Sequence, residues 1–357
     1  MKKQTNAKWK TSLIFMILAL GLAACGGNNS AAPSSEPSGS APAAQQSEAP
    51  KSSYPEKSIT IMAPSGAGGG LDLTARALSK AYTDTKLITQ SIIVENKPGG
   101  GQAVGLSEFV TQDKNNPYKL FLPSAPLIIN NLRAEGNSPY SFRDLTPLAQ
   151  LTTDYGAIVV NADSKYNDLA SLFADLKADP ASLSLAGGSA PGSQDHLIAM
   201  LPAVKAGIDA TKIRYVSYDG GGEAITALLG GHVDVLSTDI SGVGEYLKAG
   251  KVKVLGISAP ARLTNQFSNI PTYKEQGIDA EFTIWRGLFG NKDMPADAVE
   301  FWNTQLKALS ETEEWKKQLE ANGWENGYKN AADFQAFLEV QETSIKEVLV
   351  SLGMEKK

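Results

Sequence analysis

The residues of this sequence with the clearest binding chemistry are the glycines between positions 64 and 70. Positions 58–63 are rich in β-branched residues and helical spacing returns from Leu71, so the pattern predicts a strand, a loop and a helix. A glycine loop exposes backbone N–H groups, and the helix start that follows adds unpaired donors at the positive end of its dipole. The segment therefore predicts an anion-binding geometry.

Two nucleotide-binding patterns do not fit this loop. A dinucleotide fingerprint needs a third glycine, but that position falls on Leu71 when counted from Gly66 and on Leu73 when counted from Gly68. A P-loop ends in Gly-Lys-Ser/Thr, and Leu71-Asp72-Leu73 supplies no lysine. Taken alone, the loop is open to two interpretations, an anion site and a tight turn.

Similar loops end other predicted strands. One spans 187–193, another spans 219–223, and a strand end at 236–239 runs into 240–242. Strands that alternate with helices favour parallel sheets covered on both faces, and ligands bind such sheets beyond the carboxyl ends of the strands. We therefore expect these loops to share one cleft rich in backbone donors and hydroxyls.

The elements that position these loops alternate along the chain. Strands are expected at 92–96, 119–122, 157–160, 182–186, 233–236 and 252–257, and short helices at 103–110 and 224–229. The roughly 300 residues beyond the N-terminal segment favour two domains over one core. Large apolar residues from Trp302 to Leu338 have helical spacing and are expected to pack against the first domain.

The N-terminal segment is predicted to be an export signal followed by a disordered tether. Lysines precede an apolar run at 13–24 that is too short to span a bilayer comfortably and is typical of a signal peptide over residues 1–24. The run ends in Leu-Ala-Ala-Cys25, which resembles the lipobox of bacterial lipoproteins, whose cysteine carries acyl chains such as palmitate. Residues 25–53, rich in Ser, Ala, Pro, Gln and Gly, are predicted to be this lipidated cysteine and a disordered tether.

Composition narrows the function classes. A net charge of −5 without clustered Lys and Arg argues against nucleic-acid binding. Cys25 is the only cysteine, and His196 and His232 are the only histidines, so neither a disulfide nor a transition-metal site is expected within the chain. No cofactor is expected.

The segment Val216–Val235, which contains Gly-Gly-Gly-Glu-Ala and Leu-Leu-Gly-Gly, resembles the V-P-Y-K-G-G-G-x-A-x-x-A-L-L-G-G-x-V-D segment of the substrate-binding proteins of tripartite tricarboxylate transporters. The segments 68–76, 96–101, 187–197 and 270–289 resemble further motifs of the same family, in the same order. The mature chain therefore resembles the Bug, or TctC-like, family of extracytoplasmic solute receptors.

The resemblance implies an α/β fold of the two-domain Venus-flytrap type, similar to type II periplasmic binding proteins, with a ligand cleft between the domains. Crossing strands are expected near Leu148–Val160 and Phe282–Phe289. The first domain would then be discontinuous, comprising 54–153 and 283–357, and the second would span 154–282.

The same resemblance implies a small organic carboxylate, a di- or tricarboxylate or an aromatic acid, held mainly by backbone N–H groups, hydroxyls and water. The ligand-binding residues expected are Ser65, Gly66, Gly68, Gly69, Asp72, Ser124, Ala125, Gly188, Ser189, Gly192, Ser193, Tyr218, Gly220, Thr238 and Asp239.

The predicted function is a lipid-anchored, extracytoplasmic receptor, monomeric and not an enzyme, that delivers its ligand to the large and small membrane subunits of a transporter. The long tether favours a Gram-positive cell surface. The alternative is an exported α/β enzyme. A serine hydrolase would use Ser189, although Pro191 stands where the nucleophile motif needs glycine. A dinucleotide enzyme would use Glu95 after the second strand.

Overall fold

The computed structural model describes residues 53–136, 138–218 and 220–356. The predicted signal peptide, the predicted lipidation site Cys25 and the predicted tether up to residue 52 lie outside the described residues. The described strands are β1 (Ile59–Ala63), β2 (Ile92–Asn96), β3 (Lys119–Phe121), β4 (Leu145–Asn161), β5 (Ser184–Gly187), β6 (Arg214–Ser217), β7 (Val235–Asp239), β8 (Val252–Ile257), β9 (Thr283–Asn291) and β10 (Glu325–Asn330). The α-helices are α1 (Gly70–Thr85), α2 (Ala103–Thr111), α3 (Pro126–Leu132), α4 (Leu169–Ala178), α5 (Gln194–Lys205), α6 (Gly221–Leu229), α7 (Gly244–Lys248), α8 (Ala296–Ser310), α9 (Glu313–Asn322) and α10 (Ala331–Ser351).

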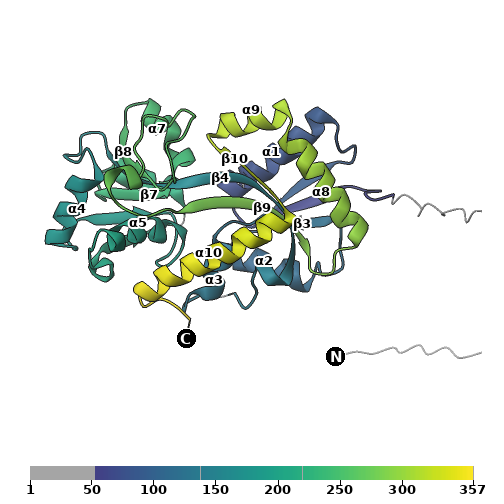
Figure 1. The fold of residues 1–357 in the computed structure, drawn as a ribbon, viewed down its shortest axis with the longest axis horizontal. Helices are drawn as coiled ribbons and strands as arrows, with labels where there is room; N and C mark the ends of the chain where they lie inside the picture. The colour runs from purple at the N-terminus through teal and green to yellow at the C-terminus, as the bar shows by residue number, and fades with distance from the viewer. Residues whose placement is uncertain (1–52, 137, 219, 357) are drawn as a thin grey trace, which may run out of the picture. The chain divides into compact units, whose positions relative to one another are not determined.

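The long strand β4 joins two groups of strands (Figure 1). Its residues Leu145–Tyr155 pair with β9, and β10 joins it from the other side. From Gly156 onward, β4 pairs instead with β7 and β8. This change of partner at Tyr155/Gly156 lies close to position 153/154, where the sequence predicts a domain boundary. The boundary itself stays a prediction.

The pairing of the strands differs in part from the parallel sheets that the sequence predicts. The βα units give parallel pairs, β1 with β2 and β3, and β5 with β6 and β7. Every pair that involves β4 or β9 is antiparallel. Local alternation of strands and helices predicts the parallel units. It does not reveal that two long strands cross between them in opposite directions.

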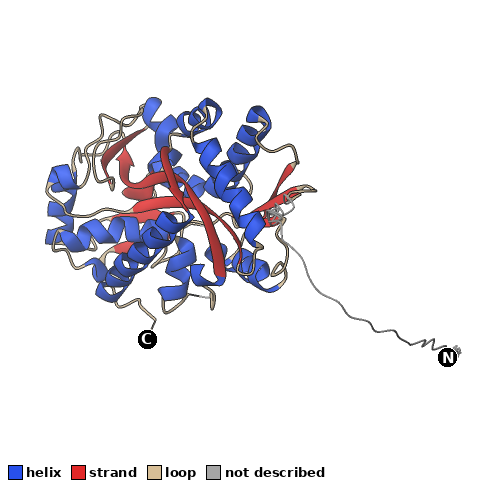
Figure 2. Cartoon of the chain, turned by 45° about the vertical axis from the view of Figure 1, so that its right-hand side comes forward, coloured by secondary structure: helices blue, strands red, loops and turns tan. Residues whose placement is uncertain are grey.

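Helices cover the strands on both faces, with the crossing strands in the middle (Figure 2). The predicted C-terminal helices are confirmed: Trp302, Leu306 and Leu309 of α8 and Trp315 and Leu319 of α9 are buried in one cluster with β1 and α1. These contacts pack α8 and α9 against β1 and α1, the two elements that flank the first glycine loop.

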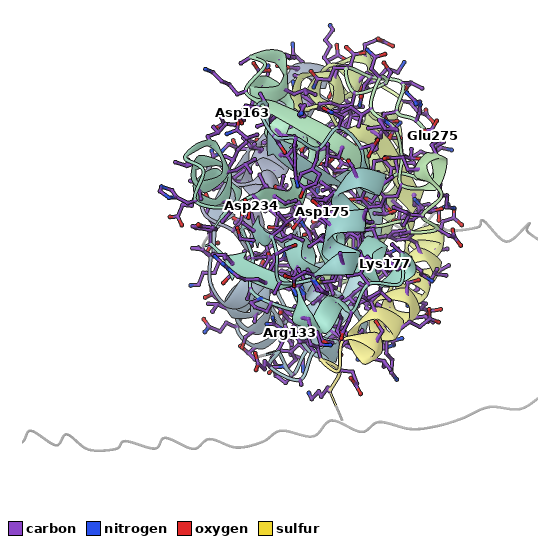
Figure 3. The ribbon with its side chains drawn as sticks, turned by 90° about the vertical axis from the view of Figure 1, so that its left-hand side faces the viewer. Arg133, Asp163, Asp175, Lys177, Asp234 and Glu275 are labelled. Atoms are coloured by element: carbon purple, nitrogen blue, oxygen red, sulfur yellow. The ribbon has the colours of Figure 1, made fainter. Side chains whose placement is uncertain are left out.

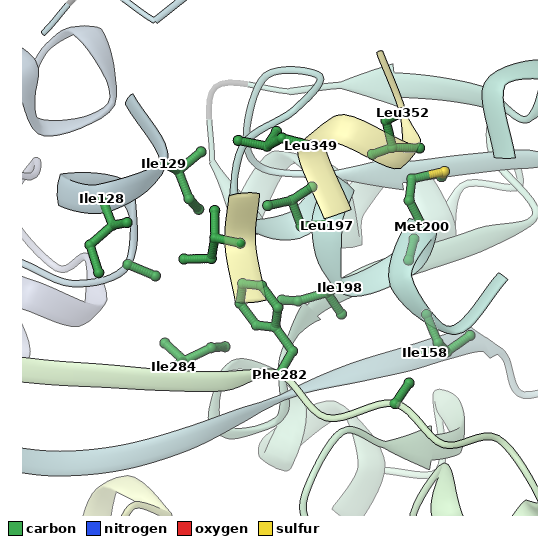
Figure 4. Close-up of a cluster of buried hydrophobic side chains, with 14 of the residues drawn as sticks. Ile128, Ile129, Ile158, Leu197, Ile198, Met200, Phe282, Ile284, Leu349 and Leu352 are labelled. Carbon is green, nitrogen blue, oxygen red and sulfur yellow. The ribbon is translucent and has the colours of Figure 1, made fainter. Parts of the chain in front are cut away.

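A second apolar cluster lies behind the crossing strands. Figure 4 shows Ile128 and Ile129 of α3, Leu197 and Ile198 of α5, and Leu349 of α10 gathered with Phe282 and Ile284 around the start of β9, and all seven side chains are buried. Because the cluster also contains Met62 of β1 and Leu185 and Val235 of β5 and β7, it packs against both groups of strands.

None of the helices in the described residues combines the length and the apolar character that crossing a membrane would require.

Candidate functional site

A cavity of about 570 Å³ lies where the loop before α1 meets the loops that follow β5 and β7. These loops stand at the carboxyl ends of parallel strands, the position where ligands bind in sheets of this kind. The volume is in the range of small-molecule sites. The walls of the cavity carry charged side chains as well as backbone groups, so the cavity is polar at its centre.

One wall of the cavity is the start of α1. Gly69 is the N-cap and contributes no side-chain cap, so the first-turn N–H groups are available to a ligand. The N–H of Gly68 is occupied, because it donates to the Asp72 carboxylate at 2.8 Å. Asp72 also accepts from Arg76 and Asn96. This buried acid fixes the loop and leaves the Gly70 end of the helix facing the cavity.

Arg286 of β9 lies directly against that helix start. A Cβ added to Gly70 would come within 2.8 Å of its Nη2 atom, so the guanidinium packs where a side chain at position 70 would begin. The guanidinium stands 3.2 Å from the Asp239 carboxylate and 3.6 Å from that of Asp154, and it lies over the Trp324 ring. Its Nη1 atom is buried and has no hydrogen-bond partner among the described residues.

The opposite wall is acidic. Burial and the neighbouring Asp239 charge raise the pKa of Asp195 to about 8. Burial and the Asp154 charge raise the pKa of Asp239 to about 6, although Arg286 opposes the shift. Burial also raises the pKa of Asp154, again against the effect of Arg286. The Arg286 guanidinium therefore pairs with Asp154 and Asp239, and Asp195 lies beside Asp239.

The second glycine loop already binds a carboxyl group of the protein, that of Asp195. The N–H of Gly188 and the hydroxyl of Ser189 interact with the Asp195 carboxylate, and Ser189 Oγ also accepts the Asp195 N–H at 3.0 Å, which caps α5. His196 Nδ1 accepts the Gly192 N–H at 3.0 Å, and its ring packs edge-on against Tyr215. His196 is thus part of the scaffold of this loop.

The structure brings many of the predicted ligand residues to the cavity and leaves others outside its lining. Those that line it are Ser65, Gly68, Gly69, Ser124, Gly188, Ser189, Thr238 and Asp239. Those outside the lining are Gly66, Asp72, Ala125, Gly192, Ser193, Tyr218 and Gly220.

The residues outside the lining have structural positions. Ala125 is fully buried in the core, and Gly192 packs against Arg133 and Met354. Tyr218 is half-buried against the apolar cluster around α6, as expected for an aromatic residue at a strand end. Ser193 and Gly220 are the N-cap residues of α5 and α6.

Sequence reasoning missed the charged centre of the cavity. Arg286 lies in the segment 270–289, which the sequence predicts only as a family motif and a crossing strand, and Asp195 is not among the predicted ligand-binding residues. An arginine flanked by large apolar residues within a predicted buried strand is a signal that could have identified Arg286, since such a charge is rarely buried without a partner.

In residues 53–136, 138–218 and 220–356, no cluster of three or more His, Cys, Asp or Glu side chains is arranged to hold a metal ion.

Comparison with known proteins places this geometry in a family. The family model described as "Tripartite tricarboxylate transporter family receptor" matches residues 75–354. A TctC solute binding protein from Polaromonas, solved without ligand, is 28% identical with a TM-score of 0.68, and 84% of this chain and 100% of that chain are covered.

Two solved structures from Rhodopseudomonas palustris share the fold. MatC with bound malate is 20% identical with a TM-score of 0.72, covering 83% of this chain and 100% of its own. A second protein, solved with adipate, is 21% identical with a TM-score of 0.76, covering 85% and 100%. These matches confirm the predicted α/β, two-domain fold of the periplasmic-binding-protein type. The chain belongs to the tripartite tricarboxylate transporter family of solute-binding receptors.

Proposed function

We propose that this receptor captures a small organic carboxylate in the cavity between the loop before α1 and the loops after β5 and β7. The observation that carries the proposal is the positive wall, where the uncapped start of α1 and the buried Arg286 guanidinium lie side by side. Helix N-termini bind carboxylates through their free N–H groups, and arginine adds charge-assisted hydrogen bonds.

Neutral polar groups complete this wall. Gln102 and Ser124 are paired through two hydrogen bonds of 3.0 and 3.2 Å and both line the cavity. A second carboxylate or a hydroxyl of the ligand would meet such groups. Structural neighbours solved with malate and adipate support a dicarboxylate of four to six carbons as the starting class.

The membrane partnership is also part of the proposal. We infer that Cys25 is lipidated and holds the receptor outside the cytoplasm, and that the loaded form delivers its ligand to the large and small membrane subunits of a tripartite transporter. Uptake of the bound acid by cells that produce all three proteins tests this. A Cys25→Ser variant should leave ligand affinity unchanged and release the receptor from the membrane fraction.

Isothermal titration calorimetry of the full-length protein tests the binding step. We expect at least one organic acid among succinate, malate, adipate, citrate and benzoate to bind with a micromolar dissociation constant, which corresponds to roughly −8 kcal/mol.

The matched ligand control is the uncharged diamide of the acid that binds, for example adipamide for adipate. It has the same shape and no carboxylate, so it should bind far more weakly. Equal affinity for the acid and its diamide would contradict anion recognition at the α1 wall.

A further inference from the structure

We propose that this receptor carries its own latch, which holds the cavity closed through contacts between protein groups alone. The latch consists of the loop 264–267, which follows β8, and the corner 323–325, where α9 leads into β10. The loop belongs to the part of the receptor that contains β5 to β8, and the corner belongs to the part that contains β1 to β3 and β10. The latch therefore joins the two parts at a place separate from the crossing strands β4 and β9.

The latch forms a wall between the cavity and a hollow on the outer surface. Gln266 and Trp324 line the cavity, and both also line a hollow of about 450 Å³ beside it. Trp324 is 5% exposed, and the Arg286 guanidinium lies 4.9 Å from the centre of its ring. Separation of the loop from the corner would therefore open a route from the hollow into the cavity.

One polar contact crosses the latch. Asn265 Nδ2 donates a hydrogen bond to Glu325 Oε1 at 3.1 Å. The Oδ1 atom of Asn265 accepts the N–H of Phe267 at 3.0 Å. The side chain is therefore fixed within its own loop and presents its amide nitrogen to the other part. Hydrogen bonds to a carboxylate are stronger than those between neutral groups.

The second contact across the latch is the close fit of Gly323 against the loop. Gly323 is buried and ends α9 at a φ of 70°, and a Cβ added there would lie 2.9 Å from Gln266 Nε2 and 3.1 Å from Phe267 Cε2. Phe267 is 1% exposed and packs in one apolar cluster with Val243 and Ile257. Because close-packed interiors leave little free space, its ring has little room to yield. Phe267 therefore connects the corner to the core of the other part.

The loop of the latch is held firmly to its own part. Arg262, just before the loop, forms an ion pair with Glu275 at 2.8 Å. Glu275 also accepts the N–H of Thr272 at 2.8 Å, and Thr272 lies beside Ile257 of β8. These contacts join the two ends of the segment 262–272, so the loop should move together with β8.

A second contact between the two parts lies elsewhere on the receptor. Arg133, which follows α3, donates to the Pro191 carbonyl oxygen in the loop after β5, and its side chain packs against Gly192. Figure 3 shows Arg133 well apart from Glu275, which braces the latch loop. Release of the latch alone should therefore open the cavity at the edge near α9 without separating the two parts completely.

The inference goes beyond the proposed function, because it concerns the movement of the receptor and holds for any ligand. Ligand must pass between the two parts both to enter and to leave, so a latch made of protein groups slows both steps. It also predicts that the closed arrangement is well populated before any ligand binds.

The test is pulsed electron double resonance on the full-length chain after dialysis free of ligand. In a Cys25→Ser background, nitroxide labels are attached at Lys80→Cys of α1 and Lys248→Cys of α7. Both lysine side chains are exposed and form ion pairs within their own helices. The two helices belong to different parts of the receptor (Figure 1). We expect a single short-distance population to predominate when the latch is intact.

Two variants break the latch in different ways. Glu325→Ala removes the acceptor of the Asn265 hydrogen bond, and Gly323→Ala pushes the corner away from Phe267. Each should raise the ratio of long-distance to short-distance molecules by about tenfold, as expected for the loss of a hydrogen bond to a charged group or of a close fit. The variant with both changes should raise the ratio further.

Each variant has a matched control. Glu342→Ala removes a carboxylate of α10 that pairs with Arg143 of the same part. Gly353→Ala places an alanine at a φ of 66°, where the added methyl group meets nothing within 4 Å. Both glycine variants carry the cost of a left-handed alanine, so a difference between them reports the contact across the latch. Thermal unfolding shows whether each variant folds, and both controls should leave the ratio of the two populations unchanged.

Two results would overturn the inference. One is an equal ratio of the two populations in the latch variants, including the double variant, and in their controls. The other is a long-distance population that already predominates when the latch is intact. Because the experiment contains no ligand, either result leaves the proposed carboxylate binding untouched, and a failure of carboxylate binding in calorimetry leaves the latch untouched.

Discussion

Arg286 is the residue on which the electrostatics of the cavity depends. It touches the start of α1 at Gly70 and lies between Asp154 and Asp239. A cation in this position serves two purposes, because it neutralises buried acids of the protein and strengthens the field that attracts a ligand carboxylate.

Replacing Arg286 by Met should therefore affect stability as well as binding. The change leaves Asp154 and Asp239 without their guanidinium, and we expect the free energy of unfolding to fall by about 3 kcal/mol at pH 8. The pKa values of these acids would rise further above those in the unfolded chain, so the folded protein would bind more protons. The loss should therefore be smaller at pH 5 than at pH 8.

Urea unfolding at the two pH values measures this difference. The matched control is Arg143→Met, which breaks the exposed ion pair with Glu342 and should cost less than about 1 kcal/mol. A loss at Arg286 that is no greater than the loss at Arg143 would show that Arg286 does not neutralise the buried acids.

Asp72 has a structural task beside the same wall. Burial alone would raise its pKa, but hydrogen bonds from Arg76, the Gly68 N–H and Asn96 hold the pKa below its usual value. Its contribution to stability is present above the pKa of an unfolded Asp, about 4, and is lost as the pH falls through the lower folded value. An Asp72→Asn variant should lose that acid dependence and bind ligand more weakly because the loop loosens.

Denaturant unfolding of the Asp72→Asn variant between pH 2 and 6, compared with the unmodified protein, checks this. Parallel curves over the whole range would contradict the assigned role.

At the scale of elements, the cavity depends on how closely the loop after β5 approaches α6. A Cβ on Gly188 would come within 2.3 Å of the Gly221 N atom, a backbone contact that cannot be relieved by a side-chain rotation. Gly188→Ala should push the two loops apart and destabilise the protein by about 1–3 kcal/mol.

The matched control for Gly188→Ala is Gly222→Ala in α6, where the added methyl group meets nothing within 4 Å. Alanine is the better helix former, so this control should be neutral or slightly stabilising. Thermal unfolding of both variants distinguishes a backbone clash at position 188 from a methyl group that meets nothing at position 222. Equal unfolding midpoints for the two variants would show that the loop after β5 does not approach α6 tightly.

The elements themselves were largely predictable. The strands 92–96 and 252–257 agree with β2 and β8 as the sequence predicts them, because β-branched runs bounded by glycine and proline are strong local signals. The strand predicted from the residues alone, 157–160, is only the end of the 17-residue β4, whereas the crossing strand that the family resemblance implies, near Leu148–Val160, covers most of it. Its earlier part, with Pro147 and Asp154, lacks a continuous apolar pattern and becomes a strand through its pairing with β9 and β10.

The parts of the site that are formed by backbone N–H groups could be predicted from the sequence. The parts that are formed by side chains from distant segments could not. Glycine loops at strand ends are visible in one stretch of sequence. The contact of Arg286 with Gly70 joins residues more than two hundred positions apart, and the burial of Asp195 depends on the packing of α5 against β7. These tertiary contacts give the cavity its charge, and no local pattern encodes them.

At the scale of the whole receptor, β4 and β9 connect the two groups of strands, and the cavity takes residues from both. A ligand that touches both parts favours the arrangement in which they are close. Ligand at about 100 times its dissociation constant should add roughly 2.7 kcal/mol to the free energy of unfolding. Thermal unfolding across a ligand concentration series measures this gain, and a midpoint that does not depend on concentration would contradict it.

The most direct measurement is a crystal structure of the receptor with its tightest-binding acid. We predict one ligand carboxylate within hydrogen-bond distance of the first-turn N–H groups of α1 and of Arg286 Nη1. A ligand bound elsewhere, or bound in the cavity with its carboxylate turned toward Asp195 and away from α1, would contradict the account.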